Sequence, residues 1–200
     1  MTKIISGGLT ALLLCLGASC YALSPDLSDP PKNATDSSAS KIDRILVNTD
    51  CQKLYTLNIK GDTLDIYPCS TSKYGIGNQL GSNKTPLGVH RIADKRGDGK
   101  PLGAIFKAKV YTGQEAEIVQ SPVSTGKDYV TTRIMHLEGT EPGVNKGEGI
   151  DSYRRYIYIH GTPEEGLIGK PASHGCVRMK NEDVVKLYDQ VSVGTIVEII

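Results

Sequence analysis

Short segments of alternating apolar and polar residues, each followed by a turn, run through most of this 200-residue sequence. Such alternation over about four to eight residues predicts half-buried β-strands. The chain has 22 glycines but only one phenylalanine and no tryptophan, which favours short strands and tight turns over long helices. Strands are therefore expected at Arg44–Asn48, Gln52–Asn58, Thr63–Ser70, Val89–Ile92, Val130–Leu137, Arg155–His160 and Thr195–Ile200.

One segment near the C-terminus has helical periodicity. Its apolar face is formed by Val184, Leu187, Tyr188 and Val191, and Asn181 is a suitable N-cap. Because helices do not alternate with strands along the chain, a parallel α/β sheet is not expected. The fold class predicted is mostly β with minor α, a curled sheet or β-sandwich with one helix in the C-terminal half.

The first 22 residues have the pattern of an export signal. Lys3 gives a positive start, and Gly7–Cys20 is an apolar stretch of 14 residues, shorter than the roughly 20 that span a bilayer. Cleavage after Ala22 is favoured over the alternative, a lipoprotein acylated at Cys20, because the residues before Cys20 lack the usual leucine. We therefore expect an exported protein of the periplasm or cell envelope.

Residues 23–41 form a polar segment rich in Ser, Pro and Asp. This segment has too little apolar surface to offset the entropy of ordering, so it is expected to be a disordered linker. The folded domain is then expected over residues 42–200.

Charge and histidine spacing exclude two kinds of partner. The formal net charge of +1 rules out the strong basic field of a general nucleic-acid-binding protein. His90 and His136 have no metal-ligand spacing and are expected to be structural or to lie at a pocket rim. Neither a metal nor another cofactor is predicted.

The five cysteines give an odd count for an exported protein, in which cysteines usually pair. Cys15 and Cys20 would leave with the signal, so Cys51, Cys69 and Cys176 remain. In the hairpin formed by the second and third strands, Cys51 stands opposite Cys69, which predicts a disulfide and leaves Cys176 alone. The alternative is that this pair supplies a thiol able to trap Cys176 in a disulfide.

The residues around Cys176 are those of a reactive thiol. His174 lies two residues before it, Arg178 lies two residues after it, and Gly175 frees the backbone between them. A nearby imidazole and a cation favour the thiolate form. The alternative is a buried cysteine with a structural histidine.

His160 is the candidate base for this thiol. It ends an alternating strand, where it is either a core residue whose hydrogen-bonding groups have partners or a functional residue. Residues 161–172 contain glycine and proline, so the chain can loop back and bring imidazole and thiol together across the sheet.

Together these residues resemble the signature of the L,D-transpeptidase catalytic domain, found in a family of bacterial cell-wall enzymes. The signature consists here of His160-Gly161, a short glycine-bearing loop, and Ser173–Arg178. The similarity includes the Thr85–Gly88 turn, the Thr132–Asn145 segment and the helix after the cysteine, so it covers about residues 42–200. Thr85 itself is expected to be a turn residue and not a ligand.

The resemblance implies a β-rich fold and a ping-pong acyl transfer that needs no cofactor. Cys176 would attack the carbonyl of the L-centre of meso-diaminopimelate in a peptidoglycan tetrapeptide stem, and D-Ala would leave. An amine would then take the acyl group, giving a 3→3 cross-link or an attached protein. His160 matches the general base, the Gly161 carbonyl holds its other nitrogen, and the N–H groups of Gly175 and Cys176 form the oxyanion hole.

Three further residues are assigned to the substrate pocket. Ser173 is expected to hold the loop through its hydroxyl. His174 is expected to shape the pocket. Arg178 suits the free carboxylate of the diaminopimelate side chain, the alternative being a surface ion pair.

Two other functions stay open at this point. An exported L,D-carboxypeptidase would give the same acyl-enzyme to water, and a cell-wall-binding module would have no chemistry. The intact Cys176, His160 and Gly175 argue against the module. The resemblance also implies acylation of Cys176 by carbapenems and, as a possible acceptor, an envelope lipoprotein. A monomer is expected.

Overall fold

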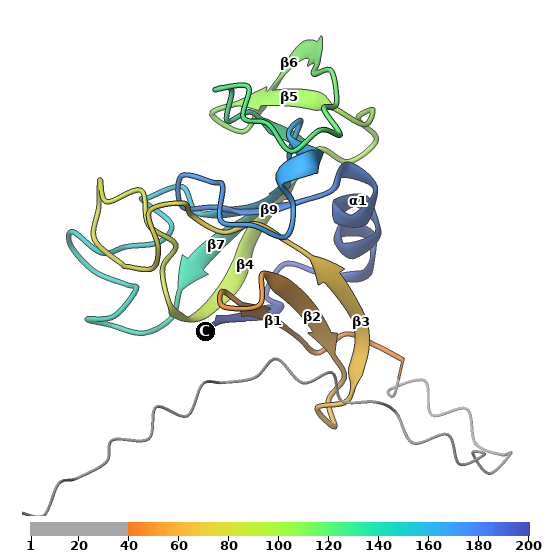
Figure 1. Cartoon of the computed structure of the whole chain (residues 1–200). Coiled ribbons are helices and arrows are strands. Elements are labelled where there is room, and N and C mark those ends of the chain that lie inside the picture. The colour runs from red at the N-terminus through yellow and green to blue at the C-terminus, as the bar shows by residue number, and fades with distance from the viewer. Residues whose placement is uncertain (1–39) are drawn as a thin grey trace, which may run out of the picture. The chain divides into compact units, whose positions relative to one another are not determined.

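The computed structural model describes residues 40–200 (Figure 1). The predicted signal, residues 1–22, and most of the predicted linker, residues 23–39, lie outside the described residues. In chain order the described elements are β1 (Arg44–Asn48), β2 (Lys53–Leu57), β3 (Thr63–Pro68), β4 (Gly88–Arg96), β5 (Ala104–Lys107), β6 (Val110–Glu115), β7 (Val130–Gly139), β8 (Tyr158–Gly161), the 3₁₀ turn η1 (Glu165–Leu167), β9 (Val177–Met179), α1 (Asn181–Gln190) and β10 (Ile196–Ile199).

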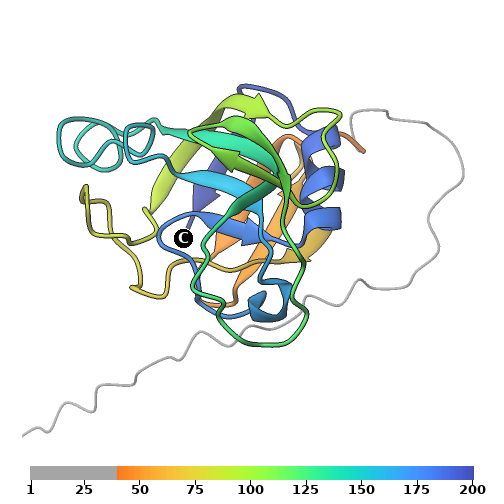
Figure 2. The same ribbon diagram turned by 90° about the horizontal axis from the view of Figure 1, so that it is seen from above.

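The strands of the described residues form one ten-stranded sheet. Its order is β3-β2-β1-β10-β4-β7-β5-β6, and β8 branches from β7 to pair with β9. Within this sheet β1 is parallel to β10 and β8 is parallel to β9, while the other pairs are antiparallel. Figures 1 and 2 show that the sheet is strongly curled. The prediction of a mostly β fold with one helix is confirmed, and the form adopted is a curled sheet.

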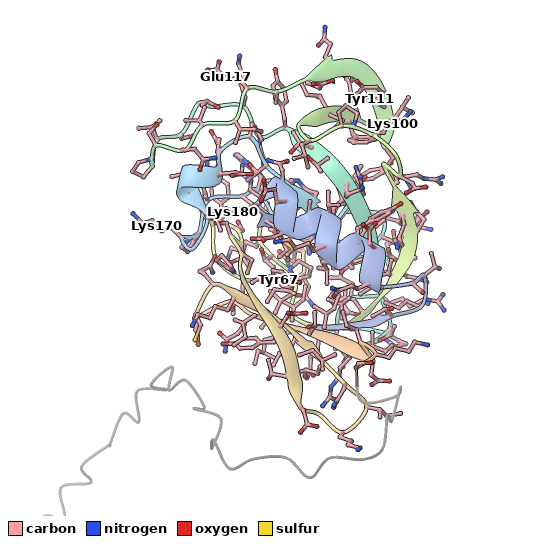
Figure 3. The ribbon with its side chains drawn as sticks, turned by 90° about the vertical axis from the view of Figure 1, so that its right-hand side faces the viewer. Tyr67, Lys100, Tyr111, Glu117, Lys170 and Lys180 are labelled. Carbon is pink, nitrogen blue, oxygen red and sulfur yellow. The ribbon has the colours of Figure 1, made fainter. Side chains whose placement is uncertain are left out.

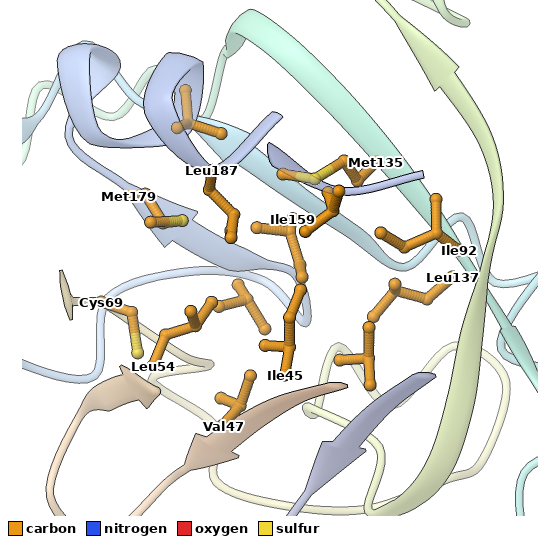
Figure 4. Close-up of a cluster of buried hydrophobic side chains, with 14 of the residues drawn as sticks. Ile45, Val47, Leu54, Cys69, Ile92, Met135, Leu137, Ile159, Met179 and Leu187 are labelled. Carbon is orange, nitrogen blue, oxygen red and sulfur yellow. The ribbon is translucent and has the colours of Figure 1, made fainter. Parts of the chain in front are cut away.

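The main core lies between the curled sheet and α1. Ile45, Leu54, Met135, Ile159 and Leu187 are all fully buried there. Figure 4 shows Leu187 of the helix meeting the sheet residues Ile159 and Met135. Burial of each such side chain stabilises the fold by about 1.5–3 kcal/mol, so this contact fixes the helix against β7 and β8, which position the site.

The helix has the apolar face that the sequence predicted, with Val184, Leu187, Tyr188 and Val191 buried. Its beginning differs, because Lys180 is the N-cap residue and Asn181 is the first helical residue. Figure 3 shows α1 facing the viewer, with Lys180 labelled at its beginning. The Asn181 side chain turns inward, and its backbone N–H donates to Glu165 Oε1 at 2.8 Å. The glutamate of η1 therefore satisfies one of the free N–H groups at the start of the helix, where the Lys180 side chain makes no capping hydrogen bond.

The predicted Cys51–Cys69 disulfide is wrong, because the Cys69 thiol is free and buried. The sequence analysis placed β2 and β3 one residue out of register. Leu54 pairs with Tyr67, and a bulge shifts the register between Thr56 and Leu57. Cys69 donates its N–H to Gln52 O at 2.9 Å, and its side chain packs in the main core. A one-residue slip moves every side chain of a strand to the other face.

Three strands were not predicted. β6 is mostly exposed, so it lacks the apolar alternation that marks a half-buried strand. β5 is only four residues long. β9 is buried along its whole length but contains Arg178, a residue type that buried strands rarely carry. No helix within residues 40–200 is long and apolar enough to cross a bilayer.

Candidate active site

The parallel pairing of β8 with β9 brings the predicted catalytic residues together. His160 is registered with Arg178, and Ile159 is registered with Val177. Registered residues of neighbouring strands share a face, and the faces alternate along each strand. Ile159 and Val177 point into the main core, so His160 and Arg178 point to the opposite face. Cys176, two residues before Arg178, lies on that face as well and packs against Tyr158.

The imidazole of His160 is buried and held in one tautomer. Its Nδ1 lies 2.6 Å from the carbonyl oxygen of Gly161. A carbonyl only accepts hydrogen bonds, so Nδ1 carries the proton and Nε2 keeps its lone pair. Burial lowers the pKa of His160 to about 4. At neutral pH the residue is therefore a neutral imidazole with Nε2 available as a base.

Cys176 is a half-buried, free thiol. Its sulfur accepts from the N–H of Tyr158 and donates to the carbonyl of Tyr156, each at 3.4 Å. Burial raises the pKa of the thiol to about 12, and the negative charge of Asp128 adds to this rise. No hydrogen bond joins Cys176 to His160 within the described residues. The resting site thus holds a neutral thiol and a neutral imidazole.

The expected effect of His174 and Arg178 on the thiol is outweighed in the resting protein: Arg178 lowers the pKa of Cys176, but burial and the charge of Asp128 raise it more. Both side chains are paired with the carboxylate of Asp128, which offsets their effect on the sulfur. A cation that is already neutralised by a carboxylate stabilises a nearby anion much less than a free one does.

Arg178 points into the protein and not toward solvent. Its side chain is 1% exposed. Nε donates to Asp128 Oδ1 at 3.0 Å, Nη2 donates to the same oxygen, and Nη1 donates to Glu164 Oε2 at 3.0 Å. The sequence predicted a guanidinium open to a substrate carboxylate, whereas here two carboxylates of the chain already occupy it. We assign Arg178 to holding these two carboxylates.

Asp128 and Glu164 connect the residues between β6 and β7 to the guanidinium of Arg178. Asp128 lies among those residues, and Glu164 binds them from outside. Glu164 Oε1 accepts from the Thr125 N–H at 2.5 Å, from the Thr125 hydroxyl at 2.9 Å and from the Ser124 hydroxyl at 3.2 Å. On the other side, Asp128 Oδ2 accepts from His174 Nδ1 at 2.5 Å. We call residues 121–129 the Asp128 loop; it is fixed to β9 by charge-assisted hydrogen bonds.

Asp128 and Glu164 were missed by the sequence analysis. Burial would raise the pKa of Asp128, but the charges of Arg178 and His160 and the hydrogen bonds from Arg178 and His174 hold it below its usual value. Asp128 lies in a polar loop without periodicity, so nothing in the sequence marks it. Glu164 follows the His160 strand closely, and its nearness to the motif was the only signal available.

The backbone around Cys176 is held by Ser173. Its hydroxyl donates to the carbonyl of Cys176 at 2.6 Å and accepts from the N–H of Gly175 at 3.2 Å, in line with the loop-holding role predicted for it. Gly175 has φ = +125°, a conformation that favours glycine. The N–H of Cys176 makes no hydrogen bond within residues 40–200. Of the two predicted oxyanion-hole donors, it is the one without a partner among these described residues.

The remaining histidines do not form a metal site. His90 Nδ1 bonds to Gly88 O at 2.9 Å and Nε2 bonds to Ser152 Oγ at 3.0 Å, which is a structural arrangement. His136 stacks on Tyr153 with ring centroids 4.0 Å apart. The described residues contain no group of three or more His, Cys, Asp or Glu side chains that could hold a metal ion.

Replacing Gly161 by alanine is expected to lower kcat by about tenfold or more and to destabilise the fold by about 1–3 kcal/mol. A Cβ at this position would lie 2.5 Å from Asn181 Oδ1 and 2.9 Å from the carbonyl of Thr131. The backbone must move, and the carbonyl that orients His160 moves with it. The measurement is kcat together with urea unfolding. Gly77→Ala is the control, since its Cβ would meet mainly the flexible side chain of Lys84; an equal loss of kcat in both variants would contradict the prediction.

The fold is expected to lose stability as the pH falls below about 6.5. Burial lowers the pKa of both His90 and His160 from 6.5 to about 4. Between these values the unfolded chain binds more protons than the folded one, so the free energy of unfolding decreases on acidification, by about 2–4 kcal/mol for each histidine. Urea unfolding at several pH values measures this. His90→Gln should remove the share of the dependence that His90 contributes, and an unchanged dependence would contradict the assignment.

Comparison with known proteins places these residues in a family. A sequence model of the L,D-transpeptidase catalytic domain matches residues 42–199. The putative L,D-transpeptidase YqjB of Bacillus subtilis is 51% identical over 133 residues, covering 58% of this chain and 73% of that protein. The probable L,D-transpeptidase YcfS of Escherichia coli is 27% identical over 156 residues, covering 78% of this chain and 43% of that protein. This chain thus spans less than half the length of the Escherichia coli relative.

Solved structures give the same family name at lower similarity. An L,D-transpeptidase from Mycobacterium smegmatis is 17% identical with a TM-score of 0.45, covering 78% of this chain and 57% of that one. The sequence match is the stronger finding, because it includes β8 and β9 with the His160 and Cys176 positions. With that match extending over residues 42–199, the chain belongs to the family of L,D-transpeptidase catalytic domains.

Proposed function

We propose that this chain is a peptidoglycan L,D-transpeptidase in which Cys176 is the nucleophile and His160 is the general base. The observation that carries the proposal is the parallel register of β8 and β9, which puts both side chains on one face. The Gly161 carbonyl leaves Nε2 of His160 as the proton acceptor. The proposed donor substrate is a tetrapeptide stem that ends in meso-diaminopimelate and D-Ala.

In the first half-reaction, His160 Nε2 takes the thiol proton while the sulfur of Cys176 attacks the carbonyl carbon of the L-centre. The carbonyl π electrons move to the oxygen, and the N–H of Cys176 stabilises the resulting oxyanion. The intermediate then collapses, the peptide bond to D-Ala breaks, and the imidazolium returns the proton to the leaving amine. A thioester and free D-Ala are the products.

In the second half-reaction an amine attacks the thioester. His160 takes a proton from the attacking nitrogen and returns it to the departing sulfur, which restores the neutral pair. The pKa of Cys176 is about 12 and that of His160 about 4, so proton transfer before attack is strongly unfavourable. Transfer therefore accompanies formation of the carbon–sulfur bond in the first half-reaction.

The location and acceptor belong to the same proposal. The signal-like residues 1–22 and the cell-wall substrate support an exported protein of the periplasm or envelope, with cleavage after Ala22 favoured over lipidation at Cys20. The acceptor amine is either a second peptide stem or an envelope lipoprotein, and the acting unit is a monomer.

The test is incubation of residues 23–200 with a disaccharide-tetrapeptide, followed by mass spectrometry. A cross-linked dimer that has lost D-Ala is expected, and Cys176→Ala should give none. A tripeptide without dimer would assign an L,D-carboxypeptidase instead. If the parent under reducing conditions gives neither product, as Cys176→Ala does, the proposal is overturned. A carbapenem should acylate Cys176, and the alanine variant should stay unmodified.

A further inference from the structure

We propose that Thr85 is a positioning residue that aims the oxyanion-hole N–H of Cys176. Thr85 lies just before β4, 90 residues from the nucleophile loop in sequence, yet its hydroxyl donates to the carbonyl oxygen of Gly175 at 3.0 Å. The residue is fully buried. The inference rests on the proposed function, because it concerns the same acyl transfer.

The direction of this hydrogen bond is fixed by a second one. The N–H of Ser72 donates to Thr85 Oγ1 at 2.9 Å, so that oxygen is an acceptor on this side. A hydroxyl has one proton, and the Gly175 carbonyl can only accept. The proton of Thr85 therefore points at Gly175 O. Both hydrogen bonds are buried, where water does not compete with them.

The carbonyl that Thr85 holds belongs to the same peptide plane as the N–H of Cys176. In a trans peptide the C=O and N–H bonds point in opposite directions. Holding Gly175 O toward the buried Thr85 therefore turns the Cys176 N–H away from Thr85. That N–H has no hydrogen-bond partner within the described residues, as a donor kept for an oxyanion requires.

The plane needs such a restraint because it follows a glycine. Gly175 has φ = +125° and no side chain to limit rotation of the next peptide. A Cβ here would lie 3.3 Å from the carbonyl oxygen of Lys84, so the segment that carries Thr85 packs directly on this glycine. Ser173 holds the following carbonyl, that of Cys176, at 2.6 Å. Two hydroxyls thus fix two successive peptide planes around the nucleophile.

The test compares two reactions of Cys176 in Thr85→Val, a variant of similar shape without the hydroxyl. Acylation by p-nitrophenyl acetate develops an oxyanion, whereas alkylation by iodoacetamide does not. Loss of one oxyanion donor typically costs about 100- to 1000-fold, so misaiming it should slow acylation by about 10- to 100-fold. Alkylation at Cys176, followed by peptide mass spectrometry, should stay within about twofold of the parent, since no oxyanion forms.

Two further variants complete the test. Thr85→Ser keeps the hydroxyl and should acylate within about threefold of the parent. Thr56→Val removes another fully buried threonine hydroxyl, one that accepts from the N–H of Asp65 in β3, and should leave acylation unchanged. The proposal is overturned if Thr85→Val is acylated at the parent rate, or if its acylation and its alkylation are slowed equally. It is also overturned if Thr85→Ser is acylated as slowly as Thr85→Val.

The ester assay also separates this inference from the proposed function. It needs only the thiol, the base and the oxyanion donor, so it reports on Thr85 whether or not a stem peptide is cross-linked. In parallel, Thr85→Val is assayed with the disaccharide-tetrapeptide, where kcat should fall and KM should change little. A parent that cross-links stems while Thr85→Val retains its full kcat would leave the function standing and remove the positioning role.

Discussion

Replacing His160 by glutamine is expected to lower the acylation rate of Cys176 by a stem tetrapeptide by about 10³-fold. Glutamine fills most of the buried space but offers no base of suitable pKa. Without a base, Cys176 must attack as a neutral thiol or through the small fraction of its side chain that is ionised at neutral pH. The measurement is the rate of D-Ala release under single-turnover conditions, with the amount of folded protein checked by circular dichroism.

The same variant should leave alkylation of the resting thiol nearly unchanged. Because the pKa of Cys176 is about 12 and that of His160 about 4, no thiolate–imidazolium pair is present to be lost. Alkylation by iodoacetamide should be slow at neutral pH and should rise about tenfold per pH unit in both proteins. If His160→Gln alkylates more than about tenfold slower than the parent at pH 7, the resting site holds an ion pair and the neutral assignment is wrong.

His90→Gln is the matched control. Like His160, His90 is buried, has its pKa lowered to about 4 and bonds through Nδ1 to a backbone carbonyl. It lies on β4, where its Nε2 bonds to Ser152 Oγ at 3.0 Å. Its replacement should change stability but leave the D-Ala release rate within about threefold of the parent. Equal losses in the two variants would mean that the His160 effect is a folding effect.

The shared face of His160 and Cys176, the pair proposed to be catalytic, was predictable because its signal is local. His160 ends an alternating strand, Cys176 follows after a short loop, and a loop of this length allows the two segments to lie side by side. The seven strands with clear alternation were found for the same reason. Apolar periodicity and turn residues are read over a few neighbouring residues, and the hydrophobic core enforces them.

The errors lie where distant partners or one-residue shifts decide the structure. The bulge after Thr56 is not marked by any glycine or proline, yet it moves Cys69 from its expected partner into the core. Arg178 is directed inward by Asp128, which lies 50 residues away, and by Glu164, so its orientation depends on contacts that no local pattern encodes. The hydrogen bond from Thr85 to Gly175 was missed for the same reason, since the two residues are 90 apart in the sequence.

Replacing Arg178 by methionine is the second large effect expected, a loss of about 3–5 kcal/mol in the free energy of unfolding. The variant leaves the carboxylates of Glu164 and Asp128 without their shared cation, and the Glu164 side chain is only 3% exposed. An unpaired buried carboxylate costs more than the ion pair contributed. Urea unfolding at pH 7 measures the loss.

The pH dependence distinguishes this cause from simple loss of packing. In the parent, burial opposes ionisation of both carboxylates, but Arg178 and the other hydrogen-bond donors hold the pKa values of Asp128 and Glu164 below their usual range. The two ionised carboxylates therefore stabilise the fold at pH values above the pKa that they have in the unfolded chain. This contribution to the free energy of unfolding is lost on acidification. In the variant burial acts unopposed by Arg178, the pKa values rise, and protonation relieves the cost. The difference between the two proteins should therefore shrink from pH 7 toward about pH 4.

Arg91→Met provides the control for removing a cation. Arg91 also pairs with a carboxylate, that of Glu138, but its side chain is 52% exposed, so its removal should cost less than about 1 kcal/mol. Arg178→Met should in addition free the Asp128 loop, because two of its anchors depend on the guanidinium. Trypsin should then cut after the exposed Lys127 at least about tenfold faster than in the parent. A variant that is destabilised at pH 7 by the same amount as at pH 4, with Lys127 still protected, would show that Arg178 acts through packing and not through the two carboxylates.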